Sequence, residues 1–109
     1  PSPGYIAGAG GNASLMAMTR GLGGHSLSDG IRVVAINPGL IRTERLVTIL
    51  KAQAEESLGD ENRWEELIDP VFVPGEPQHI ADLTAFLASD LSGNTTGTVF
   101  TVDGGSSVR

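Results

Sequence analysis

Few side chains in this sequence could carry out chemistry, and the clearest candidate is a single tyrosine. Tyr5 is the only tyrosine among the 109 residues and lies seven positions before Asn12. On a regular helix this spacing is about 10 Å along the axis, so contact between the two side chains requires a distorted first turn. Gly8, Gly10 and Gly11 would permit that distortion. Tyr5 could then contact Asn12, or it could simply pack at the start of the helix.

Other reactive groups are sparse. The chain has no cysteine, which excludes disulfides, zinc ribbons and thiolate nucleophiles. His25 and His79 have no partner at metal-ligand spacing, and the glutamates between positions 55 and 66 fit solvated helix faces rather than a catalytic carboxylate pair. The sequence therefore predicts no metal site.

Charge and hydropathy narrow the class of partner. Thirteen acidic residues against seven basic ones give a net charge of -6, and no run of Lys and Arg could neutralise a phosphate backbone. The longest apolar stretches hold about half a dozen residues, against the roughly 20 that span a bilayer. We therefore expect a cytoplasmic protein that binds neither nucleic acid nor membrane.

Predicted helices and strands alternate along the chain. In order, they are a helix over about 11–28, a strand over 31–36, and a helix over 43–58 capped by Thr43 and ended by Gly59. A short helix after Asp60, a helix over about 77–91 and a strand over 98–102 follow. The run 31–36 is almost continuously apolar, which is typical of a strand covered on both faces. Two strands joined by a long helical crossover run parallel. Two strands are few for one sheet, so the pattern favours the C-terminal half of a doubly wound α/β domain, or copies that complete one another's sheet.

The helix predicted over 11–28 carries two candidate packing faces. One is an apolar stripe made of Leu15, Met18 and Leu22. The other is a smooth face made of Ala13, Ala17, Gly21 and Gly24. Small side chains let a second backbone approach closely, so internal packing is the simpler interpretation of these faces and association of copies is the alternative.

Four collinear segments, over 12–22, 29–39, 76–90 and 96–105, together resemble the C-terminal half of a short-chain dehydrogenase/reductase. In order, they are similar to the family's long helix, its penultimate strand with a Pro-Gly turn, its last helix and its last strand. The resemblance implies that residues 1–109 are the C-terminal half of a single NAD(P)-binding Rossmann-fold domain. Its fold class is then the C-terminal part of a doubly wound parallel α/β sheet, here two parallel strands plus helices.

The resemblance also implies hydride transfer between NAD or NADP and a carbonyl or alcohol substrate. In an open α/β sheet, ligands sit beyond the carboxyl ends of the strands, which is where the Pro-Gly turn lies. The implied cofactor-binding residues are Asn37, Pro38, Gly39, Ile41 and Thr43. Among them, the backbone at Ile41 and the hydroxyl of Thr43 would contact the nicotinamide carboxamide. Homodimers or homotetramers are expected, since the family commonly assembles.

The proton-transfer motif departs from the family pattern of Tyr, three residues, then Lys. Asn12 stands in the position of the Lys, and Gly8 stands in the position of the Tyr. Asn12 could hydrogen-bond a ribose hydroxyl, but it has no charge with which to favour a tyrosinate. The resemblance thus leaves Tyr5 and Asn12 as an atypical catalytic pair.

Several functional parts of the family have no counterpart in this sequence. They are the Gly-rich phosphate loop, the adenosine-binding acid and the catalytic Ser. We therefore expect the 109 residues alone to be inactive. The alternative function is a non-catalytic dinucleotide-binding sensor, or an oligomeric scaffold, with the same fold.

Overall fold

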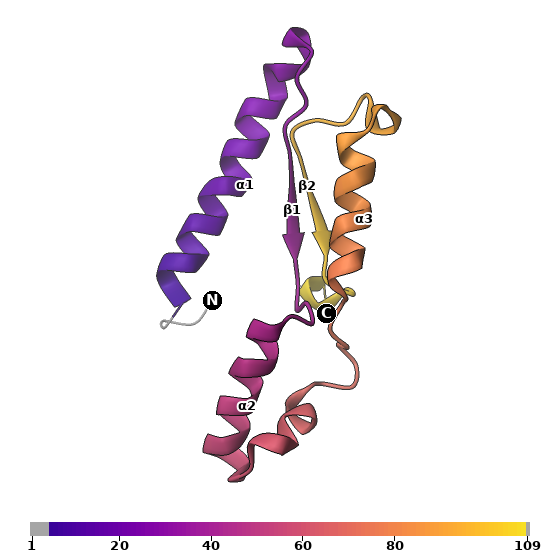
Figure 1. Ribbon diagram of the computed structural model, residues 1–109. Helices are drawn as coiled ribbons and strands as arrows, with labels where there is room; N and C mark the ends of the chain where they lie inside the picture. The colour runs from indigo at the N-terminus through magenta and orange to yellow at the C-terminus, as the bar shows by residue number, and fades with distance from the viewer. Residues whose placement is uncertain (1–4, 109) are drawn as a thin grey trace. The chain divides into compact units, whose positions relative to one another are not determined.

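The computed structural model describes residues 5–108 (Figure 1). Its regular elements are α1 (Ile6–Ser26), β1 (Val34–Pro38), α2 (Glu44–Leu58), α3 (Pro77–Ala88) and β2 (Thr98–Val102). Short 3-10 turns lie at Leu27–Asp29, Glu61–Leu67, Asp90–Ser92 and Ser106–Val108. The chain forms two compact units: a first unit of residues up to Asn37 with Thr84–Phe100, and a second unit of Pro38–Leu83 with residues from Thr101 onward. In the part of the chain that the structure describes, no helix is both long and apolar enough to cross a membrane.

The two strands form one parallel sheet, as the sequence predicts (Figure 1). The strand β2 has the predicted bounds, whereas β1 begins at Val34 instead of Ile31. The reason is local: the N–H of Ile31 donates to the carbonyl of Ser26 over 3.0 Å, which keeps it in the turn after α1. Residues 34–37 are half-buried, so the predicted burial on both faces of β1 is not reached within the described chain.

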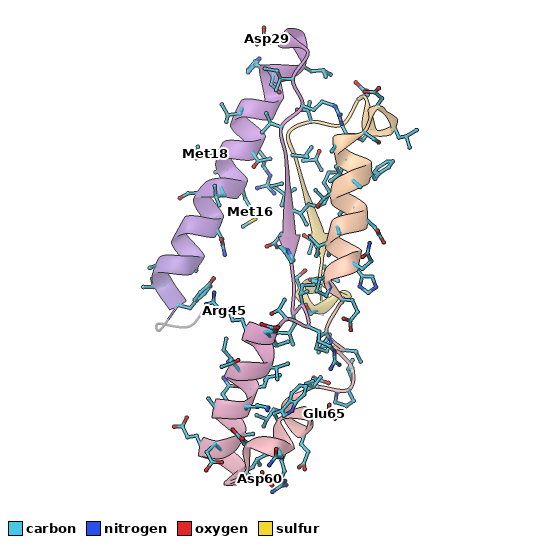
Figure 2. All side chains as sticks on the ribbon, viewed as in Figure 1. Met16, Met18, Asp29, Arg45, Asp60 and Glu65 are labelled. Carbon is cyan, nitrogen blue, oxygen red and sulfur yellow. The ribbon has the colours of Figure 1, made fainter. Side chains whose placement is uncertain are left out.

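In the first unit, α1 packs through a different face from the predicted one. Thr19 and Gly23 are its buried residues, whereas Leu15, Met18 and Leu22 are each about three-fifths exposed, at 61%, 58% and 58%. Figure 2 shows the Met16 and Met18 side chains leaving α1 on opposite sides, with Met16 toward β1. The apolar stripe is therefore an outer surface of this unit.

A threonine joins α1 to the starts of both strands. Thr96 Oγ1 donates to the carbonyl of Gly23 over 3.1 Å and accepts from the N–H of Val33 over 3.1 Å. The next residue, Gly97, donates its N–H to the carbonyl of Val33 over 2.8 Å. A Cβ at Gly23 would collide with the N and Cα of Gly97, so α1 can lie this close only because Gly23 has no side chain.

The last helix ends earlier than the periodicity predicts, because a half-buried arginine binds its C-terminus. Arg32 donates to the carbonyl of Leu87 over 2.7 Å and to that of Ser89 over 3.0 Å, and it also contacts the hydroxyl of Ser92. A guanidinium satisfies the last helical carbonyls and interacts favourably with the helix dipole. Leu91, the last residue of the helix predicted over about 77–91, consequently lies outside α3 and is 82% exposed.

In the second unit, both predicted caps of α2 are confirmed. Thr43 Oγ1 accepts from the N–H of Leu46 over 3.3 Å. Gly59 ends the helix in the left-handed region at φ 71°. The helix buries Leu50 and Ala54 on the side of the 3-10 turn over Glu61–Leu67, which Asp60 caps. The Thr43 cap thus fixes where α2 begins.

Candidate functional site

The turn after β1 lies directly against the turn after β2. The N–H of Gly39 donates to the carbonyl of Val102 over 2.9 Å. A Cβ at Gly39 would lie 2.5 Å from the Cβ and 2.7 Å from the Cα of Asp103, far inside van der Waals contact. The Pro38–Gly39 turn thus requires glycine because another backbone approaches it closely, and not because its φ is positive.

Beyond Gly39 the chain makes a short parallel bridge between Ile41 and Gly75. Gly75 donates its N–H to the carbonyl of Leu40 over 2.8 Å and accepts from the N–H of Arg42 over 2.8 Å. Because backbone groups alternate sides along an extended segment, the N–H and C=O of Ile41 itself point to the opposite edge. A donor and an acceptor therefore stand side by side on one residue, directed away from Gly75.

Thr43 adds a hydroxyl at the start of α2. Its backbone is extended, at φ -123° and ψ 162°, and its Oγ1 accepts one hydrogen bond from Leu46. A hydroxyl that accepts in this way still has its proton to donate. The residue is exposed, and it lies beside the unpaired N–H groups of a helix N-terminus, which favour electron-rich ligand atoms.

A network of hydrogen bonds folds the turn after β2 around the carboxylate of Asp103. The carboxylate accepts from the N–H of Gly105 over 2.8 Å, from the N–H of Ser107 over 2.9 Å and from the hydroxyl of Ser106 over 3.3 Å. Hydrogen bonding from the side chain of Ser107, then from the N–H of Gly105 and the N–H of Ser107, lowers the pKa of Asp103 to about 2. Gly104 and Gly105 have positive φ, at 63° and 85°, which allows the chain to curl back onto the carboxylate.

The stability of the turn after β2 is expected to depend on pH in the acid range. The folded pKa of Asp103 lies below its unfolded value, so the stabilisation is complete above about pH 4 and is lost as the pH falls toward 2. An NMR titration of the Gly105 and Ser107 amide signals should report a midpoint near pH 2. Asp103→Asn should abolish the titration. A midpoint near pH 4 would contradict the network.

Tyr5 and Asn12 lie in the first unit, the former just before α1 and the latter within it. Tyr5 immediately precedes the helix and is 57% exposed, and Asn12 lies on an exposed part of the helix. The helix is regular from Ile6, so the distorted first turn that a direct contact requires is not formed, and no hydrogen bond joins the two side chains within residues 5–108. The phenol ring of Tyr5 instead lies over Gly8, where a Cβ would collide with the ring and stand 2.8 Å from the hydroxyl.

The absence of a side chain at Gly8 allows the ring of Tyr5 to lie where it does. The phenol thus lies against the first turn of α1, from the residue that immediately precedes the helix. The resemblance predicts Gly8 at the position of the family's tyrosine. The sequence offers the signal, a glycine at that position with a tyrosine three residues before it, but not the direction of the ring.

The predicted cofactor residues are grouped in the second unit, except for Asn37, which ends the first. Pro38 and Gly39 lie beside Asp103, Ile41 lies beside Gly75, and Thr43 begins α2. Sequence reasoning missed Asp103 and Gly75 as parts of this site. The signal for Asp103 is an Asp-Gly-Gly sequence directly after a strand, which by itself indicates only the end of that strand. Among residues 5–108, no group of three or more acidic or histidine side chains could hold a metal ion.

Comparison with known proteins identifies the family. A sequence model of one group of short-chain dehydrogenases/reductases, described as enoyl-(acyl carrier protein) reductase, matches residues 2–107. The chain belongs to the short-chain dehydrogenase/reductase family. The fold class is accordingly part of a Rossmann-type α/β sheet, as predicted.

Individual relatives agree with this assignment. The chain is 37% identical over 106 residues to the uncharacterized oxidoreductase YxbG of Bacillus subtilis, covering 94% of this chain and 36% of that protein. L-sorbose reductase from Gluconobacter frateurii, solved with NADPH and L-sorbose, matches with a TM-score of 0.73 and 28% identity, over 84% of this chain and 36% of the reductase. A short-chain oxidoreductase from Pseudomonas aeruginosa PAO1 with an atypical catalytic center matches with a TM-score of 0.65 and 27% identity, over 89% and 38% of the two chains. The chain thus spans a little over a third of the length of these relatives.

Proposed function

We propose that residues 1–109 are the C-terminal half of a single NAD(P)-binding domain, and that the full-length protein transfers hydride between NAD(P)(H) and a carbonyl or alcohol substrate. The observation that carries this proposal is the contact of Gly39 with Asp103 beyond the ends of β1 and β2. It lies where an open α/β sheet binds its ligand. Family membership and the NADPH bound to the L-sorbose reductase support the choice of cofactor.

The residues of the second unit fit a nicotinamide carboxamide. That group offers one carbonyl acceptor and two N–H donors. Ile41 directs a backbone N–H and C=O away from Gly75, and Thr43 has a hydroxyl proton to donate. In this proposal Asn37, Pro38 and Gly39 form the surface under the ring. When bound, the cofactor supplies or accepts the hydride, and the chain orients the ring and its carboxamide.

Tyr5 is the proposed proton donor to the substrate oxygen, and Asn12 the proposed hydrogen-bonding partner of the ribose. The exposed phenol over Gly8 can reach a ligand from the surface of α1. Asn12 is neutral and can both donate to and accept from a hydroxyl group. This pair replaces the Tyr and Lys of the family pattern, and the Pseudomonas relative shows that an atypical center occurs on this fold.

Tyr5→Phe in the full-length protein should lower kcat/KM for carbonyl reduction by about 100-fold or more, the usual contribution of a general acid. The substitution keeps the ring over Gly8 and removes only the hydroxyl. The Kd for NADPH, measured by calorimetry, should stay within about twofold and serves as the control. Equal turnover of the variant and the wild type, across a panel of ketoses and ketones, would remove Tyr5 from the mechanism.

A second candidate is a non-catalytic dinucleotide sensor or an oligomeric scaffold. Asn12 in place of a lysine favours the loss of catalysis, and the exposed Leu15, Met18 and Leu22 favour assembly into a homodimer or homotetramer. NADPH binding without turnover of any carbonyl compound would favour the sensor. Sedimentation of the intact protein distinguishes an oligomer from a monomer.

We also propose that the isolated 109 residues lack activity and bind the cofactor weakly. They contain no Gly-rich phosphate loop, so most of the contacts to the diphosphate of the cofactor are missing. The isolated chain is therefore inactive in this account and binds NADPH and NADH more weakly than micromolar.

A further inference from the structure

The residue Asp103 connects two parts of the second unit. Its Cα and Cβ lie against Gly39, and its carboxylate lies at the centre of the following turn. Here the main-chain contact and the side-chain network belong to one residue, so a change in the network is transmitted to Gly39 through the atoms of Asp103 alone.

The close approach leaves little freedom between the two segments. Gly39 is bound to Val102 by a 2.9 Å hydrogen bond, and the space where its Cβ would stand is filled by Asp103. A displacement of Asp103 by even a few tenths of an ångström must therefore move the Pro38–Gly39 backbone, or open a gap in a contact that is otherwise filled.

The carboxylate network fixes the direction in which the chain leaves β2. Both carboxylate oxygens accept hydrogen bonds. Oδ1 accepts from the N–H of Gly105, and Oδ2 accepts from the N–H of Ser107 and from the hydroxyl of Ser106. Backbone N–H groups that converge on an ionised carboxylate make strong, charge-assisted hydrogen bonds. Two glycines with positive φ follow Asp103, and they are the most adaptable backbone of the segment. Without the carboxylate, this pair is no longer held in one conformation.

We propose that Asp103 is a positioning residue of the cofactor site: by folding the turn over residues 104–108 it holds its own main chain against Gly39 and so fixes the surface on which the nicotinamide rests. This inference rests on the proposed function and extends it to a residue that need not touch the cofactor. Its action through Gly39 predicts a loss of affinity for the cofactor, with the chemical step left largely unchanged.

Asp103→Ala in the full-length protein tests the proposal with three readouts. We expect the Kd and KM for NADPH to rise about tenfold and kcat to stay within about twofold. We also expect amide hydrogen exchange at Gly39 to accelerate about tenfold without cofactor, because exchange reports local opening. Ser106→Ala is the matched control, since it removes only the longest of the three bonds, at 3.3 Å, and should leave all three readouts near those of the wild type.

A conservative variant keeps the test decisive if Asp103→Ala fails to fold. Asp103→Asn retains an oxygen for the N–H of Gly105 and loses the charge, so its Kd and exchange rate should fall between those of the wild type and Asp103→Ala. An unchanged Kd, or a raised Kd with unchanged exchange at Gly39, would overturn the positioning role while the proposed function stands. A wild-type protein that binds neither NADPH nor NADH would overturn the proposed function, and this inference with it.

Discussion

Replacing Gly23 with alanine in the full-length protein should destabilise it by about 2–3 kcal/mol, which is a large effect for one methyl group. The new Cβ would collide with the N and Cα of Gly97 and stand 3.0 Å from Oγ1 of Thr96. Backbone atoms cannot turn aside as a flexible side chain can. Gly97 is further held by its hydrogen bond to Val33 and by a φ of 67°, so α1 itself must move away and lose its bond to Thr96.

The helix supplies its own control for the Gly23 prediction. Gly21 and Gly24 lie on the same helix, and a Cβ at either would meet nothing within 4 Å. Alanine there should therefore stabilise the protein by about 0.5–1 kcal/mol, the ordinary gain of alanine over glycine inside a helix. Urea unfolding curves of the three variants provide the measurement. Equal midpoints for Gly23→Ala and Gly24→Ala would show that α1 does not pack against Gly97.

The second large effect is expected at the cofactor site. Gly39→Ala places a methyl group 2.5 Å from the Cβ of Asp103, so the Pro38–Gly39 turn must shift away from the turn after β2. That shift breaks or lengthens the bond from Gly39 to Val102 and moves the proposed nicotinamide surface. The Kd for NADPH should rise at least tenfold, about 1.4 kcal/mol of binding free energy.

The stability of the Gly39 variant separates this effect from simple unfolding. Gly39 lies in an exposed turn, so the cost to folding should be no more than about 1–3 kcal/mol, typical of local overpacking. Calorimetry with NADPH on the folded variant then measures the site alone. Gly24→Ala, with open space around it, should bind NADPH like the wild type. A Gly39→Ala variant with wild-type affinity would separate this turn from cofactor binding.

Local signals in the sequence predicted much of the fold. The two caps of α2, the start of α3 at Pro77 and the bounds of β2 all depend on residues within a few positions of the feature itself. Capping side chains and glycine C-caps act over that range, so one sequence is enough to find them.

The features that prediction missed depend on contacts between distant residues. The most apolar stripe of α1 is exposed because close backbone packing at Gly23 selects a different face. The end of α3 depends on Arg32, which lies far earlier in the chain. Hydrophobic periodicity contains no information on either contact.

The candidate site shows the same division. The turn from Pro38 to Thr43 is continuous in the chain, and the resemblance to the family implies its residues as one group. The contribution of Asp103 needs the pairing of two strands, and the ring of Tyr5 over Gly8 needs a side-chain direction. Neither follows from residue types and spacing alone.

Binding of the nicotinamide at the turn after β1 is the claim on which the proposed function depends most. The most direct measurement is an NMR titration of the isotope-labelled full-length protein with NADPH and with NADH, following the amide signals of Gly39, Ile41 and Thr43. We predict that all three shift and saturate together, at micromolar concentration of at least one of the two cofactors. Saturable binding that leaves these three signals in place, or no binding of either cofactor, would contradict the account.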